Sequence, residues 1–238
     1  MNIKLGLIVL LCSSFAFGND IQLIIEPILA QARQLSGAYI QDRSQAIPVV
    51  ALAGCSAVGK SYFTRLMAKA LRECGFNVFV LHQDDYLNTN RTFAGFKIHP
   101  NLDHESLHYF LSQNQAGIKK ITKPCIVDKK YLKNKELDLT RVDLIIFEGI
   151  YALTGPDTYD FVQYCSMGVF LDATTSHIVK WHALRNKKRS FFQRHGDSDI
   201  KQHATCLLYE YTRFILPSKK NAQFVVYKDD LNEYRLLA

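Results

Sequence analysis

Several patterns that would assign a chain to a specialised class are missing from this sequence. It has 6 cysteines, but none are spaced as a CxxC pair, so the sequence predicts neither a disulfide framework nor a zinc site. The glycine pattern GxGxxG is absent, which disfavours a dinucleotide-binding fold. Proline contributes 6 residues and glycine 12, and the sequence has no internal repeat or low-complexity segment. These absences exclude collagen-like and disordered classes.

What is present is typical of a globular protein. The chain has 238 residues, of which 48% are hydrophobic and 21% charged, and this length predicts one domain with one core. The formal net charge of +7 favours an anionic partner such as phosphates, a nucleic acid or a membrane surface. Because the sequence contains no recognisable DNA- or RNA-binding motif, we expect no nucleic-acid partner.

The first 18 residues differ from the rest of the chain. Lys4 is their only charged residue, the stretch Leu5–Phe17 is mostly apolar, and Ala16-Phe17-Gly18 places small residues where a signal peptidase would cut. The apolar stretch is shorter than the about 20 residues that a membrane-spanning helix needs. We therefore predict a signal-like leader over residues 1–18, a single domain over residues 19–238, and no transmembrane span in the mature chain.

Two observations disagree about the cellular compartment. The leader favours a secreted or membrane-tethered protein. Beyond Cys12, however, 5 cysteines remain, an odd number without close spacing that is typical of reduced thiols in the cytoplasm. Among them, Cys55 would be exposed to oxidation outside the cytoplasm. The sequence leaves both localisations open.

Apolar runs and helical patterns alternate along the remaining sequence. A continuous apolar run such as Ile47–Ala53 is typical of a strand that is buried on both faces. The alternation predicts an α/β fold in which a parallel five-stranded sheet is flanked by helices. Strands are expected at 47–53, 78–81, 142–147, 167–171 and 224–227, and helices at 21–35, 61–73, after Asp103, from about Ser176, and at 200–216 before Pro217.

A glycine loop between the first strand and the next helix matches the pattern GxxxxGK[ST]. The backbone N–H groups of such a loop, together with the N-terminus of the following helix, attract phosphate. Lys60 is expected to reach the β- and γ-phosphates of a nucleotide, and the Ser61 hydroxyl to bind Mg²⁺. The residues expected to bind the nucleotide here are Gly54, Cys55, Ser56, Ala57, Val58, Gly59, Lys60 and Ser61.

Carboxylates follow two of the other predicted strands. Glu148 ends the strand at 142–147, where it is placed to hold the magnesium ion, and Asp84 and Asp85 follow the strand at 78–81. If a phosphoryl group is passed to an alcohol, a carboxylate at the second position could accept the hydroxyl proton. Taken alone, Glu148 is also explained as a solvated strand end and Asp84 as a turn residue.

These segments together resemble the phosphoribulokinase and uridine kinase family of P-loop kinases, and the uridine-cytidine kinases most closely. The matching segments are 54–61, 83–86, 101–104, 145–150, 183–186 and 217–222, which follow the family's order and span about residues 47–227. The resemblance implies a P-loop NTPase fold. It also implies that Asp84 is the catalytic base toward a ribose 5′-hydroxyl and that Asp103 contacts the ribose hydroxyls. The alternative for Asp103 is the N-cap of the following helix, and one residue could do both jobs.

The acceptor-binding positions of the family are only partly kept. Leu87 stands where the family usually has tyrosine, and Val127 replaces the tyrosine of its base-contact pair, so nucleobase selection is expected to differ. The resemblance nevertheless places five residues at the acceptor: Asp84, Tyr86, Asp103, His104 and Asp128.

A basic stretch from Lys180 to Lys201 contains seven lysines and arginines. The resemblance implies a lid that closes over the triphosphate, with Arg185 as its first arginine and Arg189 or Arg194 as the next. Asn186 departs from the family, which usually has an acid after the lid arginine. A solvated basic helix is the alternative for the whole stretch.

The sequence therefore predicts a kinase that uses ATP (or GTP) and Mg²⁺ to phosphorylate a small-molecule hydroxyl, with the 5′-hydroxyl of uridine or cytidine as the first choice. Asp84, Lys60 and Arg185 are the expected catalytic groups. Use of ATP adds weight to a cytoplasmic location. The alternatives are a P-loop kinase of pantothenate, glycerate, nicotinamide riboside or a sugar phosphate, and a nucleotide-binding secreted effector or regulator without turnover. The sequence leaves a homo-oligomer open.

Overall fold

The structure is a computed structural model that describes residues 19–87, 102–127, 130–188, 205–229, 231 and 233–237. Four predictions lie wholly or largely outside the described residues: the leader at 1–18, Asp128, the lid residues Arg189 and Arg194, and the basic segment from 189 onward.

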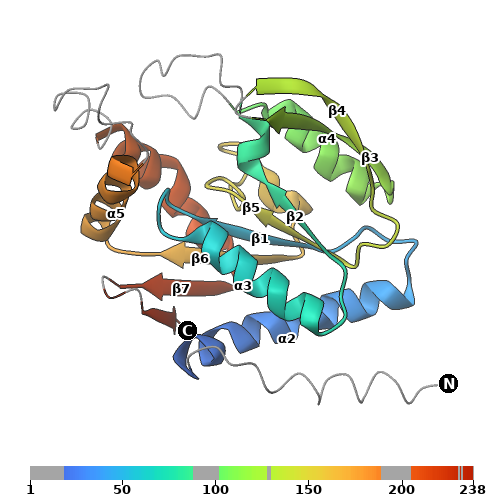
Figure 1. The fold of residues 1–238 in the computed structure, drawn as a ribbon, viewed down its shortest axis with the longest axis horizontal. Coiled ribbons are helices and arrows are strands. Elements are labelled where there is room, and N and C mark those ends of the chain that lie inside the picture. Colours follow the sequence, from blue (N-terminus) through green and yellow to red (C-terminus); the bar gives the residue numbers. More distant parts are fainter. Residues whose placement is uncertain are drawn as a thin grey trace.

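A six-stranded sheet forms the centre of the molecule (Figure 1). Its strand order is β2-β5-β1-β6-β7-β8, in which the first five strands pair in parallel and β8 pairs antiparallel to β7. The predicted parallel five-stranded sheet is thus confirmed, and β8 is an addition. The strands are β1 (Val49–Gly54), β2 (Val78–His82), β5 (Leu144–Glu148), β6 (Met167–Asp172), β7 (Phe224–Lys228) and β8 (Tyr234–Leu237).

The neighbouring inner strands β1 and β5 are buried at every residue. Their continuous apolar runs have no polar face to present to water, so they suit the middle of a parallel sheet that is covered on both sides. Parallel pairing brings the carboxyl ends of these strands to one edge of the sheet. Ligand sites of open α/β sheets lie at this edge.

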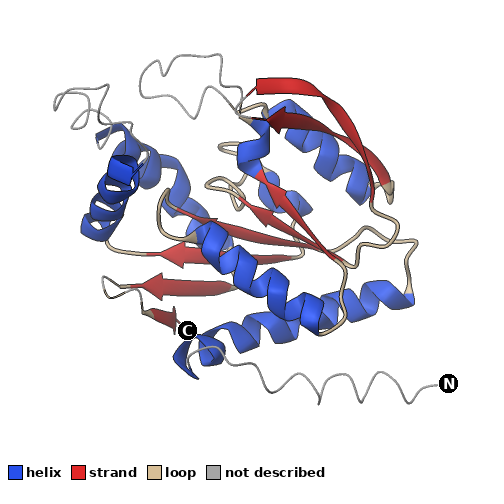
Figure 2. Ribbon diagram, viewed as in Figure 1, coloured by secondary structure: helices blue, strands red, loops and turns tan. Residues whose placement is uncertain are grey.

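Helices cover the sheet (Figure 2). The helix α3 (Lys60–Glu73) packs against β1, β2 and β5, and it buries Phe63, Met67 and Leu71 at intervals of four residues. The helix α2 (Asn19–Gln41) contacts α3 and β8; it is longer than the predicted 21–35, mainly at its C-terminal end, and it contains Pro27. The remaining long helices are α4 (His104–Gln115) and α5 (Thr175–Lys188).

A second, two-stranded sheet was not predicted. It consists of β3 (Lys120–Val127) and β4 (Lys130–Asp138), which pair antiparallel. The strand β3 contacts α4 and the short 3-10 helix η1 (Gln83–Tyr86), so the hairpin lies on the same side as the end of β2 (Figure 1).

The chain before β7 changes its helical geometry in steps. Residues 205–210 are α-helical, η4 (Tyr211–Ile215) is a π-helix, and η5 (Leu216–Asn221) is a 3-10 helix with Pro217 in its first turn. The predicted helix over 200–216 therefore loses its α-helical geometry before Pro217 and not at it. A further 3-10 helix, η2, covers Phe161–Tyr164. In the part of the chain that the structure describes, no helix has the length and apolar character that crossing a membrane requires.

Candidate active site

The glycine loop leaves β1 through backbone conformations that few residues tolerate. Gly54 has a φ of 143°, and a Cβ atom there would overlap with the carbonyl oxygen of Leu171 on the neighbouring strand. Gly59, the N-cap of α3, has a φ of 110°, and Ala57 between them has a φ of 67°. The loop therefore requires glycine at both positions, because residues with a side chain rarely adopt these φ values.

Lys60 is held inside this loop. It is 8% exposed, and its Nζ donates a hydrogen bond to the carbonyl oxygen of Cys55 over 2.9 Å. Burial lowers the pKa of the Lys60 ammonium, while the nearby carboxylates of Glu148 and Asp84 act to raise it. The Lys60 side chain therefore lies inside the loop; its contact with nucleotide phosphates stays a prediction.

Ser61 and Glu148 meet at the carboxyl ends of β1 and β5. The Ser61 hydroxyl donates to Oε1 of Glu148 over 3.0 Å, and Nδ1 of His82 lies 2.7 Å from Oε2. Burial acts to raise the pKa of Glu148, but the hydrogen bond from His82 and the charge of Lys60 outweigh it, and the pKa lies below its usual value. Glu148 is therefore ionised at neutral pH.

This pair fits a magnesium ion. A hydroxyl and a carboxylate are the hard oxygen ligands that Mg²⁺ prefers, and Mg²⁺ usually takes one or two protein ligands and completes its shell with phosphates and water. Within the described residues no three His, Cys, Asp or Glu side chains are grouped to hold a metal on their own. Ser61 and Glu148 would accordingly hold the ion together with a bound nucleotide.

Gln83 fixes the turn that carries Asp84. Its Oε1 accepts a hydrogen bond from the backbone N–H of Tyr151 over 3.0 Å, and a Cβ atom at Gly149 would overlap with the Gln83 side chain. The glycine after Glu148 is therefore required so that η1 can pack against the end of β5. Asp84 follows Gln83 in η1 and is exposed, so its carboxylate is accessible from solvent.

Asp103 caps α4, which confirms one of its two predicted roles. Its Oδ1 accepts from the backbone N–H of Ser106 over 3.1 Å, and its own N–H donates to the Tyr86 carbonyl over 2.8 Å. Leu87 and Leu102 form a β-bridge beside this contact. The start of α4 is thereby joined to η1, so Asp103 lies next to the segment that carries Asp84.

Tyr86 and a row of three further rings lie near the start of α4. Tyr86 is 1% exposed, burial raises the pKa of its phenol, and its hydroxyl has no hydrogen-bond partner among the described residues. The exposed His104 ring lies 5.2 Å from the ring of Tyr159, which in turn lies 5.0 Å from the ring of Tyr151. The Tyr151 hydroxyl donates to the Glu210 carboxylate, which links this row to the helix before β7.

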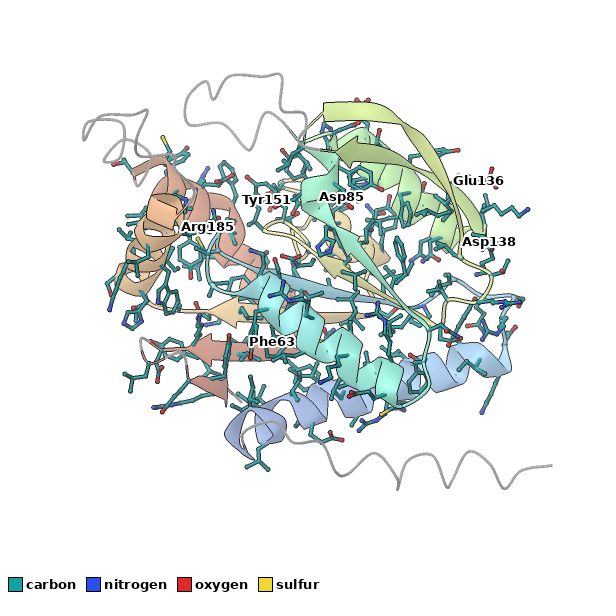
Figure 3. All side chains as sticks on the ribbon, in the orientation of Figure 1. Phe63, Asp85, Glu136, Asp138, Tyr151 and Arg185 are labelled. Carbon is teal, nitrogen blue, oxygen red and sulfur yellow. The ribbon has the colours of Figure 1, made fainter. Side chains whose placement is uncertain are left out.

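Arg185 approaches the glycine loop from α5. Its Nη2 donates to the Ser56 hydroxyl over 2.9 Å. Figure 3 shows Arg185 coming from α5 and Asp85 from η1, so the helix and the turn contribute side chains to the same end of the sheet. The structure thus brings Arg185, Lys60, Ser61 and Glu148 to one loop, and it places η1 and the start of α4 beside them.

Cys55 differs from the expectation. The residue is buried, and desolvation raises the pKa of its thiol to about 12 although Lys60 acts to lower it. A protonated, buried thiol is not reactive, so the expected exposure of this cysteine to oxidation was wrong. None of the four cysteines whose side chains are described forms a disulfide bond; they are Cys55, Cys74, Cys165 and Cys206.

Sequence reasoning missed two polar residues of this region. His82 contacts Glu148 because β2 pairs with β5 in the register that places these two residues side by side. Asp172 ends β6 next to the loop and accepts from Lys219 Nζ over 2.6 Å and from the Tyr211 hydroxyl over 3.0 Å. An acid directly after a buried strand was the available signal for Asp172, as it was for Glu148.

The chain is similar in sequence to curated small-molecule kinases. It is 28% identical to a uridine kinase of Ureaplasma urealyticum over 199 residues, which cover 79% of this chain and 91% of that protein. It is 25% identical to a pantothenate kinase of Paenarthrobacter aurescens, with 84% of this chain and 72% of that protein covered. No protein-family model matches the chain.

Solved structures share the fold. The D-glycerate 3-kinase of Cryptococcus neoformans superposes with a TM-score of 0.64 at 11% identity, covering 90% of this chain and 99% of that one. The phosphoribulokinase of Rhodobacter spheroides superposes with a TM-score of 0.60 at 11% identity, covering 79% of this chain and 71% of that one. The fold is that of the P-loop kinases, and the resemblance to the phosphoribulokinase and uridine kinase group is confirmed.

Proposed function

We propose that this protein is an ATP- and Mg²⁺-dependent kinase that transfers the γ-phosphate to a hydroxyl of a small molecule, and that a nucleoside 5′-hydroxyl is the first acceptor to test. The similarity to named uridine and pantothenate kinases supports the broader statement of a P-loop small-molecule kinase. The observation that carries the proposal is the contact of Ser61 with Glu148 at the mouth of a loop that already holds Lys60.

For the nucleotide, the chain would supply positive charges that bind the phosphates and ligands that position Mg²⁺. Lys60 would exchange its contact with the Cys55 carbonyl for the β- and γ-phosphates, and Arg185 would turn from Ser56 to the transferring group. Ser61 and Glu148 would hold Mg²⁺, which neutralises charge on the phosphates. Catalysis of this type depends on positioning and electrostatic stabilisation.

On the acceptor side, Asp84 would take the proton of the attacking hydroxyl. It is exposed, follows β2 at the ligand edge of the sheet, and belongs to a turn that Gln83 fixes against β5. Asp103 would contact the acceptor with the part of its carboxylate that does not cap α4. Tyr86 carries a buried hydroxyl without a partner among the described residues, which is a candidate contact for the acceptor.

A different alcohol is the second candidate. Leu87 and Val127 stand where the family has tyrosines for its nucleobase. A pantothenate kinase also aligns with 84% of this chain. Both observations favour an acceptor without a pyrimidine ring.

The test is phosphoryl transfer by the purified full chain with ATP and Mg²⁺ to a panel of uridine, cytidine, pantothenate, glycerate, nicotinamide riboside and ribulose 5-phosphate. Lys60→Met is the inactive control. Turnover of uridine or cytidine supports the first choice, and turnover of another alcohol keeps the mechanism and changes the substrate. ATP binding without transfer to any acceptor would contradict the proposal and favour a nucleotide-binding regulator or effector.

A further inference from the structure

Lys228, the last residue of β7, is a buried cation that the proposed reaction does not use. It is 8% exposed, and burial lowers the pKa of its ammonium. The structure gives this ammonium neither a carboxylate partner nor a hydrogen bond among the described residues. Its Nζ instead lies 4.3 Å from the ring centroid of Trp181 and 5.8 Å from that of Tyr234. A buried charge without a counter-ion is unfavourable, so this arrangement needs a reason.

The glycine loop lies directly beside this ammonium. A Cβ atom on Gly59 would be 3.5 Å from Lys228 Nζ and 3.4 Å from the Tyr234 hydroxyl. Gly59 is the N-cap of α3, where backbone N–H groups favour an anion. Because residue 59 has no side chain, Lys228 reaches the loop backbone without an intervening group.

The helix α5 contributes two side chains near this loop: one contacts the Lys228 ammonium and the other is itself a cation. The ring face of Trp181 contacts the Lys228 ammonium. Arg185, one helical turn later in α5, donates to the Ser56 hydroxyl. A cation that rests on a ring face keeps its N–H donors available, because a ring attracts the charge without accepting all of its hydrogen bonds. Trp181 therefore holds Lys228 in place without acting as a counter-ion.

We propose that Lys228 is a third nucleotide-binding cation beside Lys60 and Arg185, and that its ammonium pairs with phosphate oxygens of the bound nucleotide. This inference rests on the proposed function, since it assumes that the loop binds a nucleotide. A phosphate fits better than the base, because a base offers neutral acceptors, whereas an ammonium that has no carboxylate partner in the described part of the chain gains most from an anion.

Isothermal titration calorimetry of the full chain with ATP and with inorganic tripolyphosphate tests the inference. We expect Lys228→Met to weaken both affinities by about ten- to a hundredfold, the usual effect of removing a hydrogen bond between charged groups. Lys228→Arg, which keeps the charge, should restore most of the loss. An unchanged ATP affinity in Lys228→Met would overturn the inference, and so would a weaker ATP affinity with unchanged tripolyphosphate binding, which would indicate a base contact.

A second measurement needs no variant. Trp181 is the only tryptophan of the chain, so its fluorescence reports on the ring under Lys228. We expect saturating tripolyphosphate to change this emission in the wild-type protein, and unchanged emission would contradict the inference even if Lys228→Met failed to fold. Wild-type protein that binds neither ligand would instead refute the proposed function, while binding that is lost in Lys60→Met but kept in Lys228→Met would refute only the role of Lys228.

Discussion

The Ser61 hydroxyl donates a hydrogen bond to the Glu148 carboxylate over 3.0 Å, although the two residues are 87 positions apart in the chain. The contact exists because β1 and β5 are parallel neighbours that end at the same edge of the sheet. It joins the glycine loop to the strand that ends in Glu148, and the proposed metal site depends on it.

Changing this pair should weaken the use of Mg²⁺ more than the binding of nucleotide. For Ser61→Ala we expect the Mg²⁺ concentration at half-maximal rate to rise by about ten- to a hundredfold, since a ligand and its orientation are lost together. A Mg²⁺ titration of the transfer rate measures this. Ser61→Thr keeps the hydroxyl and is the matched control, and an equal loss in both variants would contradict the assignment.

Glu148 should also make stability depend on pH. Because its pKa is lower in the folded protein than in the unfolded chain, its ionised form stabilises the fold above its ordinary value of 4.5. That contribution is lost as the pH falls through the lower, folded value. Urea unfolding of the wild type and of Glu148→Gln measures it. The stability difference between them should be larger at pH 7 than at pH 4, and a difference that grows on acidification would contradict the direction of the shift.

Gly54→Ala should destabilise the protein strongly. A methyl group there would overlap with the Leu171 carbonyl, and the residue has a φ of 143° that alanine rarely adopts. We expect a loss of about 2–5 kcal/mol in the free energy of unfolding. Gly37→Ala is the control, because no atom lies within 4 Å of its Cβ position inside α2, and it should stabilise by about 0.5–1 kcal/mol. Urea denaturation of both variants measures the contrast.

Two substitutions of Asp103 separate its capping role from an acceptor contact. Asparagine is as good an N-cap as aspartate, so Asp103→Asn should keep the stability of the fold, whereas Asp103→Ala should lose about 1 kcal/mol. If the carboxylate also binds the acceptor, Asp103→Asn should raise the KM for the acceptor and leave the KM for ATP unchanged. Steady-state kinetics beside thermal unfolding distinguish the roles, and unchanged kinetics in Asp103→Asn would leave capping as its only role.

The local patterns of the sequence predicted the parallel strands, the glycine loop and the helix cap at Asp103, because each depends on residues that are close in the chain. The hairpin of β3 and β4 was missed, since polar, lysine-containing strands lack the apolar runs of the central sheet. The contact of His82 with Glu148 depends on the register of β2 and β5, which no local pattern specifies. The burial of Cys55 likewise follows from tertiary packing, which a motif of eight residues does not contain.

The most direct test of the account compares Asp84→Asn with Asp85→Asn, which removes a carboxylate one position away in the same turn. With the acceptor that the panel identifies, the rate of phosphoryl transfer at saturating ATP and Mg²⁺ is measured for both variants. Loss of a general base typically lowers the rate by about 10²–10⁴-fold, and we predict a loss of this size for Asp84→Asn with little change for Asp85→Asn. Nearly equal rates in Asp84→Asn and the wild type would contradict the proposed mechanism.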